Sequence, residues 1–160
     1  MHSITPCLWF NGVAEEAARF YTSVFPDSRV DSVQRAPGDY PAGKSGDVLT
    51  VEFTLMGKSF VGLNGGPAFR FNEAISFQIP VRTQEQVERF TNALSAVPEA
   101  EQCGWVKDRY GVSWQIVPEQ LIRLISGGDP AAAKRAFEAM MTMKRIDIAA
   151  LERAAGASAG

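Results

Sequence analysis

Few side chains in this sequence are equipped for nucleophilic or metal chemistry. Its 160 residues include one histidine, His2, and two cysteines, Cys7 and Cys103. A single histidine excludes any site that takes several imidazoles from one chain. A nucleophilic cysteine needs a neighbouring base, and the only imidazole stands at the N-terminal end. We therefore interpret Cys7 as a small apolar residue in the wall of a cleft, and not as a nucleophile.

Glu52 is the strongest candidate for a general base. It lies in the middle of residues 48–55, where apolar and polar side chains alternate as in a strand with one buried face. Glu52 falls on the polar side, with Thr50 and Thr54. If this side lines a cleft, Glu52 could take a proton from a substrate. The alternative is a solvated charge on the outer face of a sheet.

Asp108 and Arg109 could also form an acid–base pair, but their sequence context favours a turn. Gly111 follows two residues after Arg109. Aspartate and glycine at this spacing are typical of tight turns. We therefore interpret these residues as the connection of a hairpin.

The elements that must position these side chains repeat along the chain. The apolar pattern predicts a strand, a helix and three strands, and then the same order again. The first copy has a strand over 4–10, a helix over 13–25, strands over 28–35, 48–55 and 59–63, and a tight turn at 57–58. The second has a strand over 74–81, a helix that begins with a Thr83–Gln86 capping box, and strands over 100–103, 105–108 and 113–117.

Asparagine, glycine and proline at 64–67 separate the two copies. We predict paired βαβββ modules at 1–66 and 67–118, and a helical extension of the same domain over 119–160. A module with one helix on a four-stranded sheet leaves the other sheet face open. Two modules side by side could curl these faces into a shared cleft. The predicted fold class is α+β, a curled mixed sheet with C-terminal helices.

The tail carries its own helix signals. Asp129, followed by Pro130, stands where a helix N-cap is expected. Phe137 and the methionines at 140, 141 and 143 recur at helical spacing. This spacing predicts a face that packs against the body of the protein or against a partner subunit.

Composition excludes several classes of function. Sixteen basic and eighteen acidic residues give a net charge of −2, so the sequence has no basic footprint for nucleic acid. No apolar run approaches the roughly 20 residues of a membrane helix. The first residues lack the charged and then apolar order of a signal peptide. Two cysteines are too few for a disulfide framework, so we expect a reduced, cytoplasmic location.

Several segments resemble a known superfamily. They are Leu8-Trp9-Phe10, residues 17–21, the stretch from Gly104 to Pro118, and residues 143–148 in the tail. Together with the doubled βαβββ order, they resemble the vicinal oxygen chelate superfamily, which includes glyoxalase I, extradiol dioxygenases, fosfomycin-resistance enzymes and bleomycin-binding proteins. In detail the chain is similar to the PhnB-like branch, labelled 3-demethylubiquinone-9 3-methyltransferase-like.

The resemblance implies a homodimer and, for the enzymes of the superfamily, a divalent metal held by His and Glu side chains. The matching strand positions hold Thr5, Ser76 and Gln115, with a fourth near Val61 or Leu63. None of these is a His, Asp or Glu. Uncharged hydroxyl and amide oxygens bind transition-metal ions weakly. We therefore predict no conventional metal site and no cofactor.

What the resemblance leaves is a cleft with a neutral, polar floor. The predicted cleft residues are Thr5, Cys7, Trp9, Ser76, Gln78 and Gln115. Trp9 shares one side of the first strand with Thr5 and Cys7, where it could stack on a planar ligand. Such a cleft suits a small, partly aromatic or oxygenated molecule.

We therefore predict a glyoxalase-like, PhnB-like protein that binds an unidentified small organic molecule without a metal. The alternatives are an enzyme that uses Glu52 as its base, and a metalloenzyme with unusual ligands. True methyl transfer is not expected. Asn11-Gly12-Val13 follows the first strand, where a nucleotide-binding parallel sheet would have a glycine-rich turn.

Overall fold

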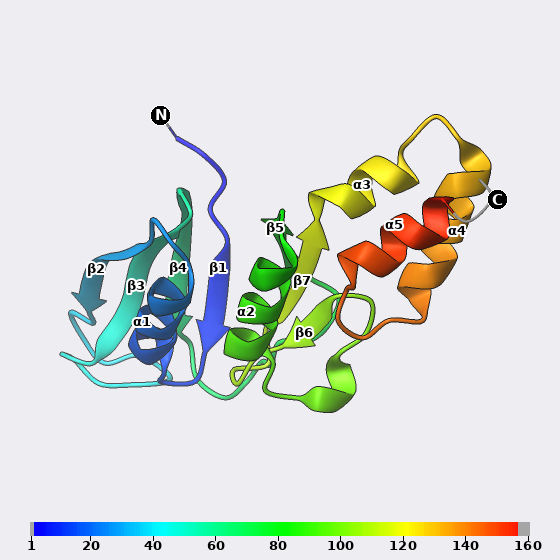
Figure 1. Cartoon of the computed structure of the whole chain (residues 1–160). Helices are drawn as coiled ribbons and strands as arrows, with labels where there is room; N and C mark the ends of the chain where they lie inside the picture. Colours follow the sequence, from blue (N-terminus) through cyan, green and yellow to red (C-terminus); the bar gives the residue numbers. More distant parts are fainter. Residues whose placement is uncertain (1, 157–160) are drawn as a thin grey trace. The chain divides into compact units, whose positions relative to one another are not determined.

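The computed structural model describes residues 2–156, and its contacts divide the chain into two compact units, residues 1–71 and 72–160 (Figure 1). The division falls a few residues after the predicted module boundary, and the C-terminal helices belong to the second unit. The modules 1–66 and 67–118 stay a proposal. Within residues 2–156, none of the helices has the length and apolar character that a membrane crossing needs.

The first unit is a four-stranded mixed sheet with one helix. Its elements are β1 (Cys7–Phe10), α1 (Ala14–Val24), β2 (Arg29–Arg35), β3 (Val48–Leu55) and β4 (Lys58–Asn64). The strand order is β1-β4-β3-β2. β1 runs parallel to β4, whereas β4, β3 and β2 are antiparallel neighbours.

Helix α1 covers one face of this sheet and leaves the other face open. Tyr21 of α1 and Phe53 of β3 are fully buried, with ring centroids 6.2 Å apart. Phe60 of β4 stacks on Phe53 at 5.5 Å. Successive strand residues point to opposite faces, so Glu52 and Thr54 point away from α1. We call this helix-free side the open face.

The hairpin between β3 and β4 turns at Met56 and Gly57, whose φ angles are 48° and 85°. Leu55 pairs with Lys58 across this turn. Positive φ at both central residues is the pattern of a type I′ turn, which matches the twist of the flanking strands. The predicted turn at 57–58 is wrong by one residue, because a methionine rarely takes the left-handed conformation found here.

Asn64, at the end of β4, fixes the beginning of α1. Its Oδ1 accepts a hydrogen bond from the Ala14 N–H at 2.9 Å, and its Nδ2 donates to the Val48 carbonyl at 3.0 Å. Val13 occupies the N-cap position and offers no side-chain bond. Asn64 therefore caps the helix from a distant part of the chain. The sequence suggested only a linker at this residue.

The second unit combines a three-stranded sheet with four helices and a short 3₁₀ turn. Its elements are β5 (Ser76–Val81), α2 (Gln84–Leu94), η1 (Pro98–Ala100), β6 (Trp105–Lys107), β7 (Ser113–Pro118), α3 (Glu119–Ile125), α4 (Pro130–Met141) and α5 (Ile148–Gly156). The strand order is β5-β7-β6, with β5 and β7 parallel. Helix α2 begins with the predicted capping box of Thr83 and Gln86. The predicted α+β fold class is confirmed.

The strand predicted over 100–103 is wrong. The chain there passes from η1 into an isolated bridge between Gln102 and Trp105. Cys103 and Gly104 both have positive φ, which no regular strand contains. Their N–H groups donate instead to carbonyls of residues 143 and 144, at 2.8 and 2.9 Å. Residues 143 and 144 therefore accept the hydrogen bonds that a neighbouring strand would accept in a sheet.

Residues 143–148, which we call the C-terminal strap, also bind the first turn of α2. Gln84 Oε1 accepts a hydrogen bond from the Ile148 N–H at 3.0 Å, and its Nε2 donates to the Ile146 carbonyl at 2.9 Å. Ile146 is fully buried, in the core cluster that the strap shares with α3 and α5. Polar and apolar contacts therefore both hold the strap in place.

An ion pair should make the docking of the strap weakly sensitive to acid. The Arg145 guanidinium, and then the Gln84 amide, hold the pKa of Glu88 below its ordinary value. A carboxyl group with a lowered pKa in the fold stabilises the fold above its unfolded pKa, and this contribution is lost as the pH falls through the folded pKa. Between about pH 6 and about pH 3, wild type should lose more unfolding free energy than Glu88→Gln, by at most about 1 kcal/mol because both side chains are partly exposed. Urea unfolding at each pH measures the difference, and equal losses would contradict the prediction.

Candidate functional site

The open face of the first sheet carries a thiol and a carboxylate, the side chains of Cys7 and Glu52. One row of aligned residues crosses the sheet through Cys7, Val61, Glu52 and Ser32. By strand alternation, this row lies on the side that α1 leaves uncovered. Cys7 and Glu52 are separated by one strand and so belong to the same surface.

A β-bulge in β2 adds a second carboxylate to this surface. The register of β2 against β3 shifts between Val30 and Ser32, so Asp31 is an extra residue. Asp31 Oδ2 accepts a hydrogen bond from Thr54 Oγ1 at 2.6 Å, and Thr54 belongs to the open face. Bulges often redirect side chains beside functional sites. Asp31 therefore points to the same side of the sheet as Glu52.

These carboxylates border a hollow of about 470 Å³. This volume lies within the range of small-molecule sites, which is about 300–1,000 Å³. The hollow is lined by His2, Ser3, Thr5, Arg29, Asp31, Glu52, Phe53, Thr54, Ser59, Phe60 and Val61. The candidate site is thus formed by the N-terminal segment and three strands of one unit.

The charges around the hollow do not cancel. Arg29 Nε lies 2.7 Å from Asp31 Oδ1, so these two side chains neutralise each other. Glu52 is exposed, and its Oε2 accepts a hydrogen bond from Ser32 Oγ at 3.0 Å. Within residues 2–156, no Lys, Arg or His lies at ion-pair distance from Glu52. The hollow therefore holds one carboxylate without a counter-charge.

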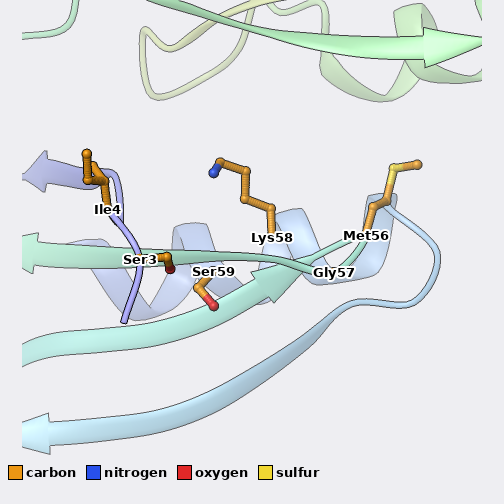
Figure 2. A pocket seen from close by; sticks show the side chains of 6 residues that line it. All are labelled: Ser3, Ile4, Met56, Gly57, Lys58 and Ser59. Carbon is orange, nitrogen blue, oxygen red and sulfur yellow. The ribbon is translucent and has the colours of Figure 1, made fainter. Parts of the chain in front are cut away.

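A smaller depression of about 380 Å³ adjoins the hollow at the β3–β4 hairpin. It shares Ser3 and Ser59 with the hollow and adds Ile4, Lys58 and the turn residues. In Figure 2 the side chains of Lys58 and Ile4 extend to one side, while the hydroxyl of Ser59 points to the other. These groups do not converge on one point, so we do not assign a site to this depression.

The structure places Thr5 and Cys7 on or near the hollow. Thr5 borders it, although it precedes β1 and is not part of that strand. Cys7 lies exposed on β1, and partial burial raises the pKa of its thiol. A raised pKa disfavours the thiolate, which agrees with the interpretation of Cys7 as a wall residue. The ligand-binding roles of both residues stay predictions.

Trp9 is engaged by the segment that follows β4. Its indole N–H donates to the Gly66 carbonyl at 2.8 Å, and Phe69 meets its ring edge-on with centroids 4.9 Å apart. A Cβ on Gly65 would lie 2.4 Å from the ring, so only a glycine fits there. These contacts fix the indole in place, and its stacking on a ligand stays a prediction.

The second sheet brings three of the predicted cleft residues together. Gln115 of β7 donates a hydrogen bond from Nε2 to Ser76 Oγ of β5 at 2.7 Å. Gln78 and Trp105 are the residues aligned with Gln115 on its two neighbouring strands. Trp114 points to the opposite side and is a buried core residue at 3% exposure. Ser76, Gln78 and Gln115 thus share the face opposite Trp114, which we call the open face of the second sheet.

The residues present do not fit the metal that the superfamily implies. Ser76 and Gln115, which the resemblance matches to two metal-ligand positions, are uncharged and hydrogen-bonded to each other. Across residues 2–156 no group of three or more His, Cys, Asp or Glu side chains is placed to hold a metal ion. Divalent transition-metal ions need such donors.

Asp108 is a buried structural residue of the β6–β7 hairpin. Its Oδ1 accepts hydrogen bonds from the N–H groups of Tyr110 and Val112, at 2.8 and 3.0 Å. Its Oδ2 accepts one from the Trp114 indole at 2.9 Å. This agrees with the interpretation of Asp108 and Arg109 as turn residues.

Arg29 and Asp31 are the candidate site residues that the sequence analysis missed. A strand pattern places Asp31 and Ser32 on opposite faces, so it hides a residue that a bulge redirects. The pairing register that reveals the bulge involves β3, about 20 residues further along the chain. A single sequence offers no local signal for it.

Comparison with known proteins decides the family. The chain matches the family described as 3-demethylubiquinone-9 3-methyltransferase over residues 2–117. It belongs to this family. A PhnB protein from Bacillus cereus, which carries that methyltransferase name, is 34% identical, with a TM-score of 0.61 over 73% of this chain and 99% of the other. The resemblance to the PhnB-like branch of the vicinal oxygen chelate superfamily is thereby confirmed.

Two further solved structures are similar to this chain. A protein from Pseudomonas aeruginosa is 21% identical, with a TM-score of 0.57 over 74% of this chain and 98% of the other. A glyoxylase/bleomycin resistance protein/dioxygenase domain from a Frankia species is 15% identical, with a TM-score of 0.48 over 74% and 92%. No curated protein matches the chain. The family match ends at residue 117, so helices α3, α4 and α5 lie beyond it.

Proposed function

We propose that this member of the family binds a small organic molecule on the open faces of its sheets, and that this binding needs no metal. The observation that carries the proposal is the hydrogen bond between Gln115 and Ser76 at 2.7 Å. By the resemblance, two positions that hold metal ligands in enzymes of the superfamily here hold neutral groups joined by one hydrogen bond, and the Gln115 carbonyl and the Ser76 O–H take no part in that bond. Such groups suit hydrogen bonding to an uncharged, oxygenated ligand.

The open face of the first sheet supports the same proposal. Its hollow of about 470 Å³ offers hydroxyl groups, a carboxylate and the apolar side chain of Val61. Small-molecule sites commonly combine an apolar lining with a few polar groups that orient the ligand.

Catalysis by Glu52 has less support. General bases are usually tuned by burial, and Glu52 is exposed. Methyl transfer, which the family name suggests, is not part of the proposal, because each sheet has only one parallel strand pair among the described residues. A nucleotide-binding fold for that chemistry uses a mostly parallel sheet with a glycine-rich turn.

The proposal includes a homodimer in the cytoplasm, as the resemblance and the cysteine content suggest. Four large apolar side chains on α3 and α4 are exposed, namely Ile122, Ile125, Phe137 and Met141. Met140 and Met143 instead pack against the core cluster of the second unit. Exposed apolar groups of this kind are consistent with a subunit contact.

A thermal-shift screen of small aromatic and oxygenated metabolites tests the proposed function. We expect at least one compound to raise the Tm of protein dialysed against EDTA. The affinity of the protein for that compound should fall about tenfold in Gln115→Leu, because the hydrogen bond between Gln115 and the compound is lost. The control is Asn92→Ala, an exposed amide on α2. The proposal fails if compounds raise the Tm only after zinc, nickel or manganese is added, or if none does so.

A further inference from the structure

We propose that the hollow on the open face of the first sheet binds an organic amine, with the ammonium group held by Glu52. This inference rests on the proposed function and names the ligand class for one of the two open faces.

The first argument is the charge of the hollow. Arg29 and Asp31 form an ion pair, and the second oxygen of Asp31 is taken by Thr54. Glu52 is left as the carboxylate of the hollow without a counter-charge in the part of the chain that the structure describes. An ammonium ion neutralises it, whereas an anionic ligand would be repelled.

The second argument is the orientation of Glu52. Ser32 is its aligned neighbour on β2 and donates a hydrogen bond to Oε2 at 3.0 Å. This bond positions the carboxylate before a ligand arrives, and Oε1 stays available to accept. Positioned groups lose less side-chain entropy on binding.

The third argument is the chemistry of the remaining lining. A primary ammonium group has three N–H donors and no acceptor. Thr5 and Ser59 also line the hollow, and their hydroxyl oxygens can accept the hydrogen bonds that the ammonium group does not donate to Glu52. Val61 offers an apolar surface to the carbon chain of the ligand. A metal ion is a poorer match, since the described residues include no cluster of three metal-ligating side chains.

Isothermal titration calorimetry with 1,5-diaminopentane tests this inference, with 1,5-pentanediol as its uncharged counterpart. We expect the diamine to bind wild type and the diol to give no measurable heat. Glu52→Gln keeps the acceptor for Ser32 but removes the charge, so it should weaken diamine binding at least tenfold. Glu16→Gln removes the same charge from an exposed site on α1, the helix on the other face of the sheet, and should change binding less than twofold. Raising the salt concentration should weaken diamine binding, because an exposed ion pair is screened.

The inference is overturned if the diamine does not bind, if Glu52→Gln binds it as tightly as wild type, or if the diol binds equally well. These outcomes are separate from failure of the proposed function. A neutral metabolite that stabilises EDTA-treated protein equally in wild type and Glu52→Gln would keep the proposed function and exclude Glu52 as the binding group.

Discussion

Replacing Asp108 with alanine is expected to lower the unfolding free energy of the second unit by about 3 kcal/mol or more. The side chain is 1% exposed and accepts hydrogen bonds from two backbone N–H groups and from the Trp114 indole. Alanine would remove this acceptor from the buried Val112 N–H and Trp114 indole N–H, and from the part-buried Tyr110 N–H. Each such group costs about 1–3 kcal/mol. Because this hairpin joins β6 to β7, its loss would also displace Gln115.

Urea unfolding followed by tryptophan fluorescence measures this effect. Asp129→Ala is the matched control, because Asp129 also accepts from two backbone N–H groups but is exposed. Its loss should cost only about 1 kcal/mol, as for an ordinary helix cap. Asp108→Asn should fall between the two, since an amide can serve the backbone donors or the indole but not both. A loss for Asp108→Ala no greater than for Asp129→Ala would contradict the assigned role.

The second large effect is expected at Gly104, where alanine should cost about 3 kcal/mol or more and release the C-terminal strap. Gly104 has a φ of 85°, and a Cβ there would lie 2.7 Å from the Ile116 carbonyl oxygen and 3.1 Å from Ile146 Cγ1. The Ile116 carbonyl belongs to a backbone held in the sheet, so it cannot move away cheaply. The substitution therefore combines backbone strain with a steric clash.

Gly12→Ala separates these two causes. Gly12 has a similar φ of 81°, but a Cβ there would meet nothing within 4 Å. It should therefore cost only the strain of the left-handed conformation, about 1–2 kcal/mol. Urea unfolding and limited proteolysis of the tail give the comparison. Equal costs at the two glycines, with the tail still resistant to protease, would show that the strap does not press against Gly104.

Features set by neighbouring residues could be predicted from the sequence. The alternation over 48–55 gave the bounds of β3, because one side of that strand packs on α1. The capping box at Thr83 and the N-cap at Asp129 were predicted correctly, since each satisfies N–H groups within its own first turn. These signals are local, so a single sequence contains them.

Features set by distant residues could not be predicted. Asn64 caps a helix whose first residue lies 50 positions earlier. Residues 100–103 were expected to form a strand, but the N–H groups of Cys103 and its neighbour Gly104 donate to the strap, some 40 residues later in the chain. The bulge at Asp31 depends on the register of β2 against β3. Each of these outcomes is decided by tertiary hydrogen bonding.

The candidate site divides in the same way. Alternation alone placed Ser76 and Gln78 on one face, and the structure adds the bond from Gln115. It also placed Glu52 on the open face of its sheet, while the hollow beside it depends on the bulge and on the N-terminal segment. The face that Ser76 and Gln78 share was therefore predictable, and the charge pattern of the hollow was not; the polar floor of a cleft stays a prediction.

The metal content of protein purified without chelators or an affinity tag tests the central claim most directly. We expect elemental analysis to find far less than one transition-metal ion per chain, with a Tm that EDTA does not change. One bound ion per chain, removed by EDTA together with a fall in Tm, would contradict metal-independent binding. Glu52, Ser76 and Gln115 would then become candidates for unconventional metal ligands.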